Sequence, residues 1–360
     1  MVNIKFDDIR RRIVGRLYNF AIVGATGAVG ERMVSTLETA GIPIGEIKLL
    51  SSKKSAGKKL KFQGKMITIE EATEVSFIGI DIALFSAGGE ISKWLIPHAV
   101  AAGTVCIDNT SAFRMDPMVP LVVPEVNEEA LFNHHGTISN PNCSTIQMVV
   151  ALEPIRKAFG LKKVVVSTYQ AVSGAGAAAI QELERQSKAV LAGEKFEPAV
   201  LPTKTGLKYH QIAFNCIPQI DSFHENGYTL EELKMMDETK KIMSLPQLKI
   251  AATCVRLPVS IGHSESVYIE VDQLGATVEG IQQLLKDAPG IKLVDDPKNQ
   301  VYPMPIDSVG LNEVLVGRVR KDLDDPKGFH LWVVSDNLLK GAAWNSVQIA
   351  QSLIKKGIVS

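Results

Sequence analysis

The sequence has few cysteines, no excess charge of either sign and no long apolar run. Its four cysteines show no CxxC spacing among 360 residues, so neither a zinc site nor a disulfide framework is indicated. The 39 Lys+Arg balance 39 Asp+Glu, which disfavours a nucleic-acid partner. Every apolar run stops well before the ~18 residues of a membrane span. We therefore expect a cytoplasmic protein that binds neither nucleic acid nor membrane.

We expect neither a secretory signal nor a metal site in this sequence. In residues 1–18, Asp7 and Asp8 are mixed with Arg10, Arg11 and Arg12, and no apolar stretch follows. We interpret these residues as an N-terminal extension and assign it no role. Histidines and acidic residues never fall at a ligand spacing such as HxxxH, so no metal site is expected.

Short apolar runs alternate with helical stretches over residues 19–142. This pattern is typical of a parallel sheet that is buried on both faces, and it predicts a doubly wound, Rossmann-type α/β domain. Residues 143–336 contain two helical stretches and several alternating strands, which predicts a catalytic α+β domain with a mixed sheet. We expect residues 337–360 to form a helix that packs back on the first domain.

A glycine-rich turn, GATGAVG, follows the first predicted strand and precedes a helix that starts near Ala28. Glycines let the backbone approach a pyrophosphate, which then lies at the positive end of the helix. The spacing is GxxGxxG instead of GxGxxG, so a strand-to-helix turn without a ligand stays an alternative.

A second polar segment, Ser51-Ser52-Lys53-Lys54-Ser55, follows the second predicted strand. A carboxylate in this place would bond the ribose of NAD and repel a 2′-phosphate. Hydroxyl and ammonium groups favour that phosphate instead, so NADP is predicted over NAD. The alternative is a pair of lysines that only face solvent.

Cys143, in SNPNCST, is the candidate nucleophile. It precedes a predicted helix over residues 145–159, whose N-terminal N–H groups would stabilise a thiolate. The other cysteines are expected to be small hydrophobic side chains or to lack a helpful neighbour. A thiol beside a nicotinamide suits an aldehyde or an activated acyl group, because a thioester can form on the sulfur. His263, between VRLPV and SESVYIEVD, is the best candidate for proton transfer.

The segments GATGAVG, SKKSAGK, FSAGG, TSAFRM, NPNCSTIQ, STYQAVSGAG, ENGYTLEELK, GHSES and DNLLKGAAWNSVQIA occur in this order. From about Asn19 to Ile354 the chain resembles the aspartate-β-semialdehyde dehydrogenase family. The resemblance implies that NADPH reduces L-aspartyl-4-phosphate to L-aspartate-4-semialdehyde and phosphate, in the synthesis of lysine, threonine and methionine. It also implies a homodimer built on the sheet of the second domain, or a dimer of such dimers.

The resemblance assigns roles to catalytic residues. Cys143 would attack the acyl phosphate and His263 would act as general acid and base. Gln170 would orient the acyl group, and Asn142 would aim its backbone or amide at the oxyanion or the phosphate.

The resemblance also assigns binding residues. Arg256 would hold the substrate carboxylate as a planar fork, and Glu231 would take the α-ammonium group. Lys234, three residues along the same helix face, would meet phosphate together with Arg114. The implied cofactor contacts are Thr26, Gly27, Ala28 and Val29 for the pyrophosphate, Ser52, Lys54 and Ser55 for the 2′-phosphate, and Ser173, Gly174 and Asn337 for the nicotinamide end. Lys54 replaces the arginine that is common in the family.

Two other functions compete with this one. An N-acetyl-γ-glutamyl-phosphate reductase would use a similar thiol, but its substrate has no ammonium group to pair with Glu231. A non-catalytic NADP-binding protein would not need Cys143, Gln170, Arg256 and His263 together.

Overall fold

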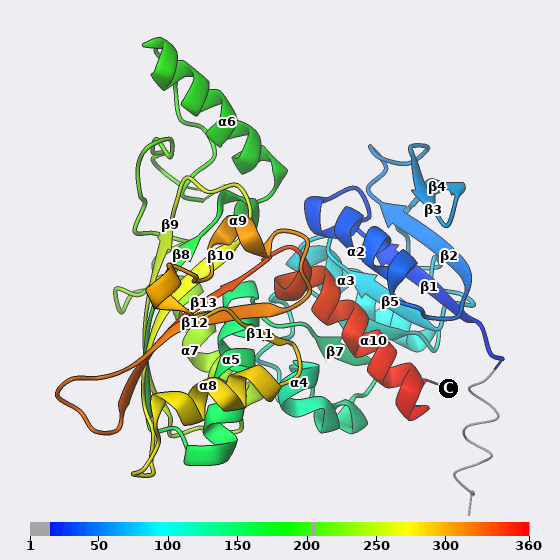
Figure 1. The fold of residues 1–360 in the computed structure, drawn as a ribbon. Helices are drawn as coiled ribbons and strands as arrows, with labels where there is room; N and C mark the ends of the chain where they lie inside the picture. The colour runs from blue at the N-terminus through cyan, green and yellow to red at the C-terminus, as the bar shows by residue number, and fades with distance from the viewer. Residues whose placement is uncertain (1–14, 204–205, 360) are drawn as a thin grey trace, which may run out of the picture. The chain divides into compact units, whose positions relative to one another are not determined.

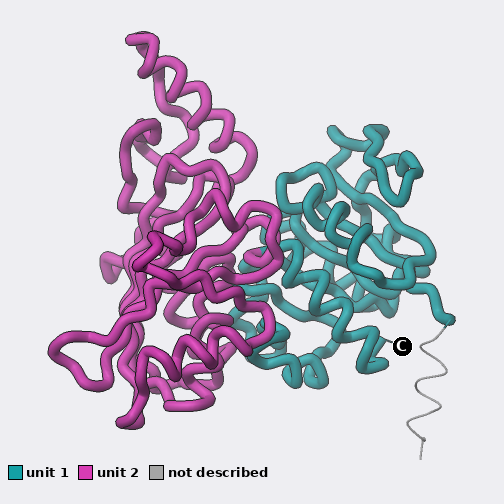
Figure 2. The backbone as a smooth tube through the Cα atoms, in the orientation of Figure 1, with its two compact units in different colours: residues 1–141, 342–360 teal, residues 142–341 magenta. Residues whose placement is uncertain are grey.

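The structure is a computed structural model that describes residues 15–203 and 206–359. The chain divides into two compact units, shown in Figure 2: unit 1 comprises residues 1–141 and 342–360, and unit 2 comprises residues 142–341. Most of the predicted N-terminal extension therefore lies outside the described residues. None of the helices in the described ranges is long and apolar enough to cross a membrane.

Unit 1 contains a sheet with the strand order β3-β4-β2-β1-β5-β6-β7 (Figure 1). All neighbouring strands are parallel except β3 and β4, which form an antiparallel pair. The strands span β1 Tyr18–Val23, β2 Ile44–Ser51, β3 Lys59–Phe62, β4 Lys65–Glu71, β5 Ile82–Phe85, β6 Val105–Asp108 and β7 Thr137–Ser139.

Both faces of this sheet are covered, as its continuous apolar strands require. On one face, Met33 and Leu37 of α2 (Ala28–Thr39) and Val347 and Leu353 of α10 (Trp344–Lys356) join one core cluster. On the other face, α3 (Gly89–Ala101) contributes Leu95 to a second cluster. The short helices α4 (Pro124–Asn127) and η1 (Glu128–Asn133) complete the unit.

The direction in which the chain adds strands to the sheet of unit 1 reverses at β1. It first moves outward from β1 to β2, and later returns to place β5 on the opposite side of β1. The carboxyl ends of such strands border a crevice where open α/β sheets bind ligands. The predicted glycine-rich turn, directly after β1, lies at this switch point.

Unit 2 contains a mixed sheet with the strand order β11-β12-β13-β10-β8-β9. Its strands span β8 Lys163–Gln170, β9 Lys249–Arg256, β10 His263–Glu270, β11 Ile291–Leu293, β12 Val314–Lys321 and β13 Gly328–Ser335. The pairs β8–β9 and β11–β12 are parallel, and the other pairs are antiparallel.

Helices cover one face of the second sheet. α5 (Cys143–Phe159) packs on β10 and β13, α7 (Leu230–Ile242) on β9, and α8 (Val278–Asp287) on β12. In β8, Val164, Val166 and Thr168 are buried on this face, whereas Val165 on the opposite face is 37% exposed. The remaining helices are η2 (Val172–Ala175), α6 (Ala177–Ala192), η3 (Pro297–Asn299), α9 (Pro305–Ser308) and the π-helical turn η4 (Leu339–Ala343).

The division of the chain differs from the predicted boundaries at two places. Unit 1 ends at Pro141 instead of residue 142, and the C-terminal segment joins it only from Ala342 instead of residue 337. Residues 337–341 belong to unit 2 because Asn337 bonds Ser173 and Gly262, and Gly341 lies against Cys143.

Candidate active site

Cys143 is the first residue of α5 and is partly buried. The helix begins two residues before the predicted start because Asn142 caps it. The Asn142 Oδ1 atom accepts hydrogen bonds from the backbone N–H groups of Ser144 (3.0 Å) and Thr145 (3.2 Å). A side chain at Gly341 would place its Cβ 2.8 Å from the Cβ of Cys143, so only glycine leaves room for the thiol there. The sulfur thus lies at the positive end of a capped helix.

The other candidate catalytic residues come from the ends of neighbouring strands. Gln170 ends β8 and pairs with Arg256 at the end of β9. His263 starts the antiparallel strand β10 and pairs with Ser335 at the end of β13. Because β10 also pairs with β8, these ends form one edge of the sheet, and all four side chains are buried. The sheet register therefore brings together Gln170, Arg256 and His263, which lie up to 93 residues apart in the sequence.

His263 has its Nδ1 atom occupied as an acceptor, because the backbone N–H of Ala171 donates to it at 3.0 Å. In the neutral ring the proton is therefore on Nε2, an atom that has no hydrogen-bond partner in the described residues. Burial and then the positive charge of Arg256 lower the pKa of His263 well below its usual value. His263 is thus a neutral imidazole with a free N–H donor.

Arg256 lies beside His263 and is 3% exposed. Its Nη1 atom donates to the carbonyl oxygen of Ala171 at 2.7 Å. Burial lowers the pKa of the Arg256 guanidinium, and the nearby Glu231 and Cys143 oppose that shift. Since an arginine stays charged even so, this is a buried cation close to the nucleophile.

Ala171 is a site residue that the sequence did not reveal. Its backbone N–H bonds His263 and its carbonyl oxygen bonds Arg256, so one alanine positions both side chains. An apolar residue that acts through its main chain leaves no signal in residue type.

Glu231 and Lys234 share one face of α7, as their spacing predicted, and their charged groups are 3.5 Å apart. The Glu231 carboxylate is 5% exposed and accepts a hydrogen bond from Gln170 at 3.2 Å. Lys234 also pairs with Asp221 at 2.6 Å, and this acid was not foreseen. Burial would raise the pKa of Asp221, but the hydrogen bond and charge of Lys234 bring it below its usual value. A phosphate at Lys234 would therefore share the lysine with two carboxylates.

Asn142 differs from its sequence-based prediction. Its backbone N–H donates to Glu238 at 2.7 Å, and its amide Nδ2 donates to Glu231 at 2.9 Å. The backbone donor is therefore not available to an oxyanion or phosphate, because a buried carboxylate already uses it. Asn142 caps α5 and connects it to α7.

Three of the residues expected at the nicotinamide end lie together in unit 2. The hydroxyl of Ser173 and the side chain of Asn337 bond each other at 2.9 to 3.1 Å, and Asn337 Oδ1 also accepts from the Gly262 N–H at 3.0 Å. A Cβ at Gly174 would lie 2.9 Å from Arg256 Nη1 and 3.2 Å from His263 Nε2. Gly174 thus leaves open the space beside the two buried site residues.

The glycine-rich turn of unit 1 has the shape that its sequence predicted. Gly24 has φ +89°, and a Cβ there would lie 2.6 Å from the carbonyl oxygen of Ser86. A Cβ at Gly30 would collide with the carbonyl oxygen of Gly24. Gly27 caps α2 without any side-chain hydrogen bond, and Thr26, Ala28 and Val29 are only partly buried. The first turn of α2 thus offers backbone N–H groups to a phosphate.

The polar segment after β2 lies next to this turn. Ser51, the last residue of β2, exchanges a hydrogen bond with Thr26 at 2.9 Å between their hydroxyl oxygens. Ser52 and Lys54 are exposed and Ser55 is partly exposed, in a turn where the Ser55 N–H donates to the Ser52 carbonyl at 2.8 Å. These side chains are accessible to a ligand on the glycine-rich turn.

Arg114 lies in unit 1, after β6, and is 8% exposed. Its Nη2 atom donates to the carbonyl oxygen of Asn109 at 2.9 Å. Arg114 therefore belongs to a different unit from Cys143 and Lys234, and its phosphate contact stays a prediction.

All four cysteines are in the reduced form. Cys106 and Cys254 are buried, and burial raises the pKa of each thiol. Across residues 15–203 and 206–359, no group of three or more His, Cys, Asp or Glu side chains is placed to hold a metal ion.

Comparisons with known proteins cover nearly the whole chain. Residues 19–134 match a family described as "Semialdehyde dehydrogenase, NAD binding domain", and residues 152–340 match "Semialdehyde dehydrogenase, dimerisation domain". An aspartate-semialdehyde dehydrogenase of Bacillus subtilis is 63% identical over 346 residues, which cover 96% of this chain and 100% of the relative.

Solved structures of similar proteins agree with this. Aspartate semialdehyde dehydrogenase II of Vibrio cholerae, described as complexed with ASA, is 47% identical with a TM-score of 0.89, covering 95% of this chain and 99% of its own. An aspartate semialdehyde dehydrogenase of Candida albicans, described as with NADP, is 25% identical with a TM-score of 0.73, covering 96% of this chain and 100% of its own.

Proposed function

The chain belongs to the aspartate-semialdehyde dehydrogenase family and is an oxidoreductase with a nicotinamide dinucleotide-binding domain, and from this we propose how its residues carry out the reaction. The reaction is the reductive dephosphorylation of L-aspartyl-4-phosphate to L-aspartate-4-semialdehyde and phosphate, in amino-acid biosynthesis. The observation that carries the proposal is the convergence of Cys143, at the start of α5, with the buried His263 and Arg256.

Cys143 forms the covalent bond to the substrate. Its sulfur, as the thiolate that the α5 N-terminus stabilises, attacks the acyl carbon, the carbon–oxygen bond to phosphate breaks, and a thioester remains on the enzyme. NADPH, when bound, supplies the hydride that reduces this thioester. The carbon–sulfur bond then breaks, which releases the aldehyde and regenerates the thiolate.

His263 handles the proton at Nε2. Because Nδ1 is held by the Ala171 N–H, the neutral ring presents Nε2–H to the oxygen that becomes negative during attack. The lowered pKa keeps His263 neutral when no substrate is bound. After hydride transfer, the same N–H donates a hydrogen bond to the substrate oxygen that becomes negative again, until the carbon–sulfur bond breaks.

The amino-acid end of the substrate is held by two buried charges. Arg256 receives the α-carboxylate, because a fixed guanidinium matches a carboxylate with two parallel hydrogen bonds. Glu231 takes the ammonium group. Gln170, which donates a hydrogen bond to the Glu231 carboxylate, orients the acyl group. Lys234 and Arg114 meet the phosphate. A buried carboxylate favours an ammonium over an acylated amine, so N-acetyl-γ-glutamyl phosphate is not favoured as the substrate.

NADP is the cofactor that we propose within the nicotinamide class. The turn of unit 1 fits a dinucleotide, since Gly24 and Gly30 have no room for a Cβ and the α2 N-terminus has no side-chain cap. Thr26 to Val29 would hold the pyrophosphate. Ser52, Lys54 and Ser55 would hold the 2′-phosphate, and Ser173, Gly174 and Asn337 would approach the nicotinamide.

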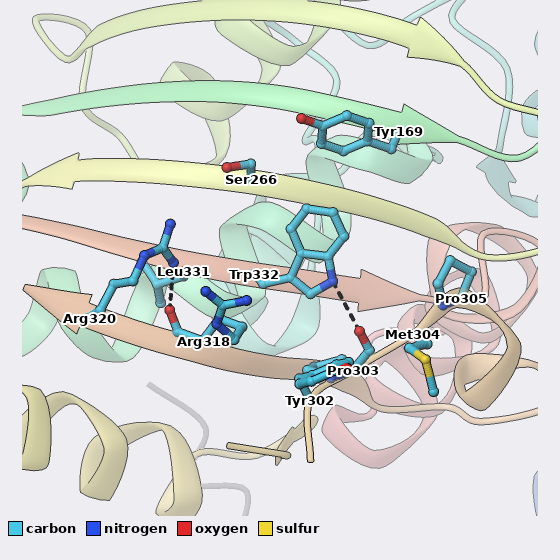
Figure 3. Close-up of a pocket in the computed structure, with 10 residues that line it drawn as sticks. All are labelled: Tyr169, Ser266, Tyr302, Pro303, Met304, Pro305, Arg318, Arg320, Leu331 and Trp332. Carbon is cyan, nitrogen blue, oxygen red and sulfur yellow. Dashed lines mark hydrogen bonds between the residues drawn. The ribbon is translucent and has the colours of Figure 1, made fainter. Parts of the chain in front are cut away.

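We propose a homodimer, or a dimer of such dimers, that uses the open face of the unit 2 sheet. Figure 3 shows a hollow on this face where Tyr169, Tyr302 and Trp332 lie near Arg318 and Arg320. The Trp332 indole donates to the Pro303 carbonyl at 3.0 Å and is thereby fixed in place. Aromatic and arginine side chains of this kind are enriched at protein interfaces. The reduced cysteines also suit a cytoplasmic enzyme.

The substrate assignment is tested by following nicotinamide absorbance with NADP, inorganic phosphate and either aspartate semialdehyde or N-acetylglutamate semialdehyde. We expect phosphate-dependent NADPH formation with aspartate semialdehyde alone. Activity only with the acetylated aldehyde would contradict the role of Glu231, and activity with neither would contradict the reaction.

A further inference from the structure

The first turn of α5 is held by two carboxylates from α7. Glu231 and Glu238 lie seven residues apart, about two helical turns, and therefore on the same face of α7. Glu231 accepts from the side-chain amide of Asn142 at 2.9 Å, and Glu238 accepts from the backbone N–H of Asn142 at 2.7 Å. Asn142 in turn caps the helix that begins with Cys143. Both carboxylates thus act on the residue directly before the nucleophile.

The two carboxylates differ in what a substrate would do to them. Glu231 also bonds Gln170 and Lys234, so an incoming ammonium group would compete for its oxygens. Glu238 bonds a main-chain N–H, which the substrate does not replace. It is 1% exposed, and a carboxylate hydrogen bond at this distance is strong where water is excluded.

We propose that Glu238 is a positioning residue for Cys143: its carboxylate fixes the main chain at Asn142, and thereby the place of the thiol, whether or not substrate is bound. This inference rests on the proposed role of Cys143 as nucleophile. Glu238 does not contact the substrate in this account. Its effect passes through Asn142 to the reacting sulfur, and a displacement of that sulfur by a fraction of an ångström slows attack.

Three variants separate the effect of the length of the Glu238 side chain from the effect of its charge. Glu238→Gln keeps an oxygen at the same distance but removes the charge, whereas Glu238→Asp keeps the charge and shortens the side chain. Glu238→Ala removes both. We expect Gln to keep kcat within about threefold, and Asp and Ala to lower kcat by about tenfold or more while KM for aspartate semialdehyde stays within about threefold.

Glu232 supplies a matched control on the same helix. It is 8% exposed, and it accepts from the backbone N–H groups of Thr229 at 2.8 Å and Cys254 at 3.0 Å, away from Asn142. We expect Glu232→Ala to lower the melting temperature without a comparable loss of kcat. If Glu232→Ala and Glu238→Ala reduced kcat equally, the effect would be one of helix stability and the proposal would be wrong.

Alkylation of Cys143 by iodoacetamide, without substrate or cofactor, gives a second measurement. We expect the Glu238→Gln variant to be alkylated at nearly the rate of the unchanged enzyme, and the Glu238→Asp and Glu238→Ala variants to be alkylated about tenfold more slowly. If the Asp variant were alkylated faster than the Gln variant, the charge of residue 238 and not its side-chain length would control the reactivity of Cys143, and the proposal would be wrong. Because this assay needs no substrate, it tests the positioning role even if the proposed reaction fails.

Discussion

At the scale of single residues, the site depends on a small number of buried side chains. His263 and Arg256 are held by the two main-chain polar groups of one residue, the N–H and the carbonyl oxygen of Ala171. This arrangement fixes the proton of His263 on Nε2 and places a cation beside it. The imidazole is therefore a donor before the reaction begins.

Gly174→Ala tests how tightly this pair is packed. The new Cβ would lie 2.9 Å from Arg256 Nη1 and 3.2 Å from His263 Nε2, so one of them must move. We expect kcat/KM to fall by about tenfold or more, because small displacements of catalytic groups are costly. The melting temperature should change little, since Gly174 is exposed and has no left-handed backbone conformation. Unchanged kinetics would show that the two side chains can adjust.

Glu265 predicts a dependence of stability on pH. The side chain is fully buried beside the site, and neither carboxyl oxygen has a hydrogen-bond partner in the described residues. Burial raises the pKa of Glu265 well above its usual value, with a smaller opposing effect of the nearby Gln147 amide. A raised pKa in the folded state gives stability that is complete below the pKa of the unfolded chain and is lost as pH rises.

Glu265→Gln removes this titration and keeps the shape of the side chain. We therefore expect the variant to raise the melting temperature by about 2 °C or more at pH 8, and by less at pH 5. Differential scanning calorimetry at the two pH values measures this. An equal shift at both values would contradict a carboxyl group that is protonated in the folded chain.

At the scale of helices and strands, the sequence predicted the elements better than the contacts between them. Glu231 and Lys234 share one helix face as expected, and α5 starts only two residues earlier than predicted. The role of Glu238 could not be predicted, because it bonds a residue 96 positions away in the sequence. Asp221 was missed for a similar reason, since nothing near it in the sequence indicates Lys234.

The segment after β2 gives a prediction about cofactor choice. Lys53 and Lys54 are consecutive and both exposed, but only Lys54 is expected to contact the 2′-phosphate. Lys54→Glu should lower the ratio of kcat/KM for NADP over NAD by about tenfold, because a carboxylate repels that phosphate. Lys53→Glu, with the same charge change, should alter the ratio much less. Equal effects would point to the general field of the segment and not to a contact.

At the scale of the whole molecule, the proposed cofactor-binding turn and the proposed catalytic residues lie in different units, each built on its own sheet. Unit 1 holds the glycine-rich turn, and unit 2 holds Cys143, His263 and Arg256. Apolar patterning and glycine motifs could predict both folds, because each pattern is local. The neutral state of His263 could not be predicted, since it follows from burial and from Arg256, which lies on another strand.

The open face of the unit 2 sheet predicts the oligomeric state. Val165 is 37% exposed in the middle of β8, so a charge there would be placed in the proposed dimer interface. Val165→Glu should shift the protein from dimer to monomer in sedimentation velocity at micromolar concentration. Val75→Glu, at a 69% exposed valine of unit 1, should leave the dimer intact. A dimer that persists in both variants would place the interface elsewhere.

Cys143 carries the acyl group in the proposed reaction, and mass spectrometry of the protein and of its peptides tests this most directly. The enzyme is mixed with aspartate semialdehyde and NADP without phosphate, with Cys143→Ser as the control. We expect a mass increase of one aspartyl group on the peptide that contains Cys143, and we expect it to be lost again when phosphate is added. An adduct on another residue, or NADPH formation with no dependence on Cys143, would contradict it.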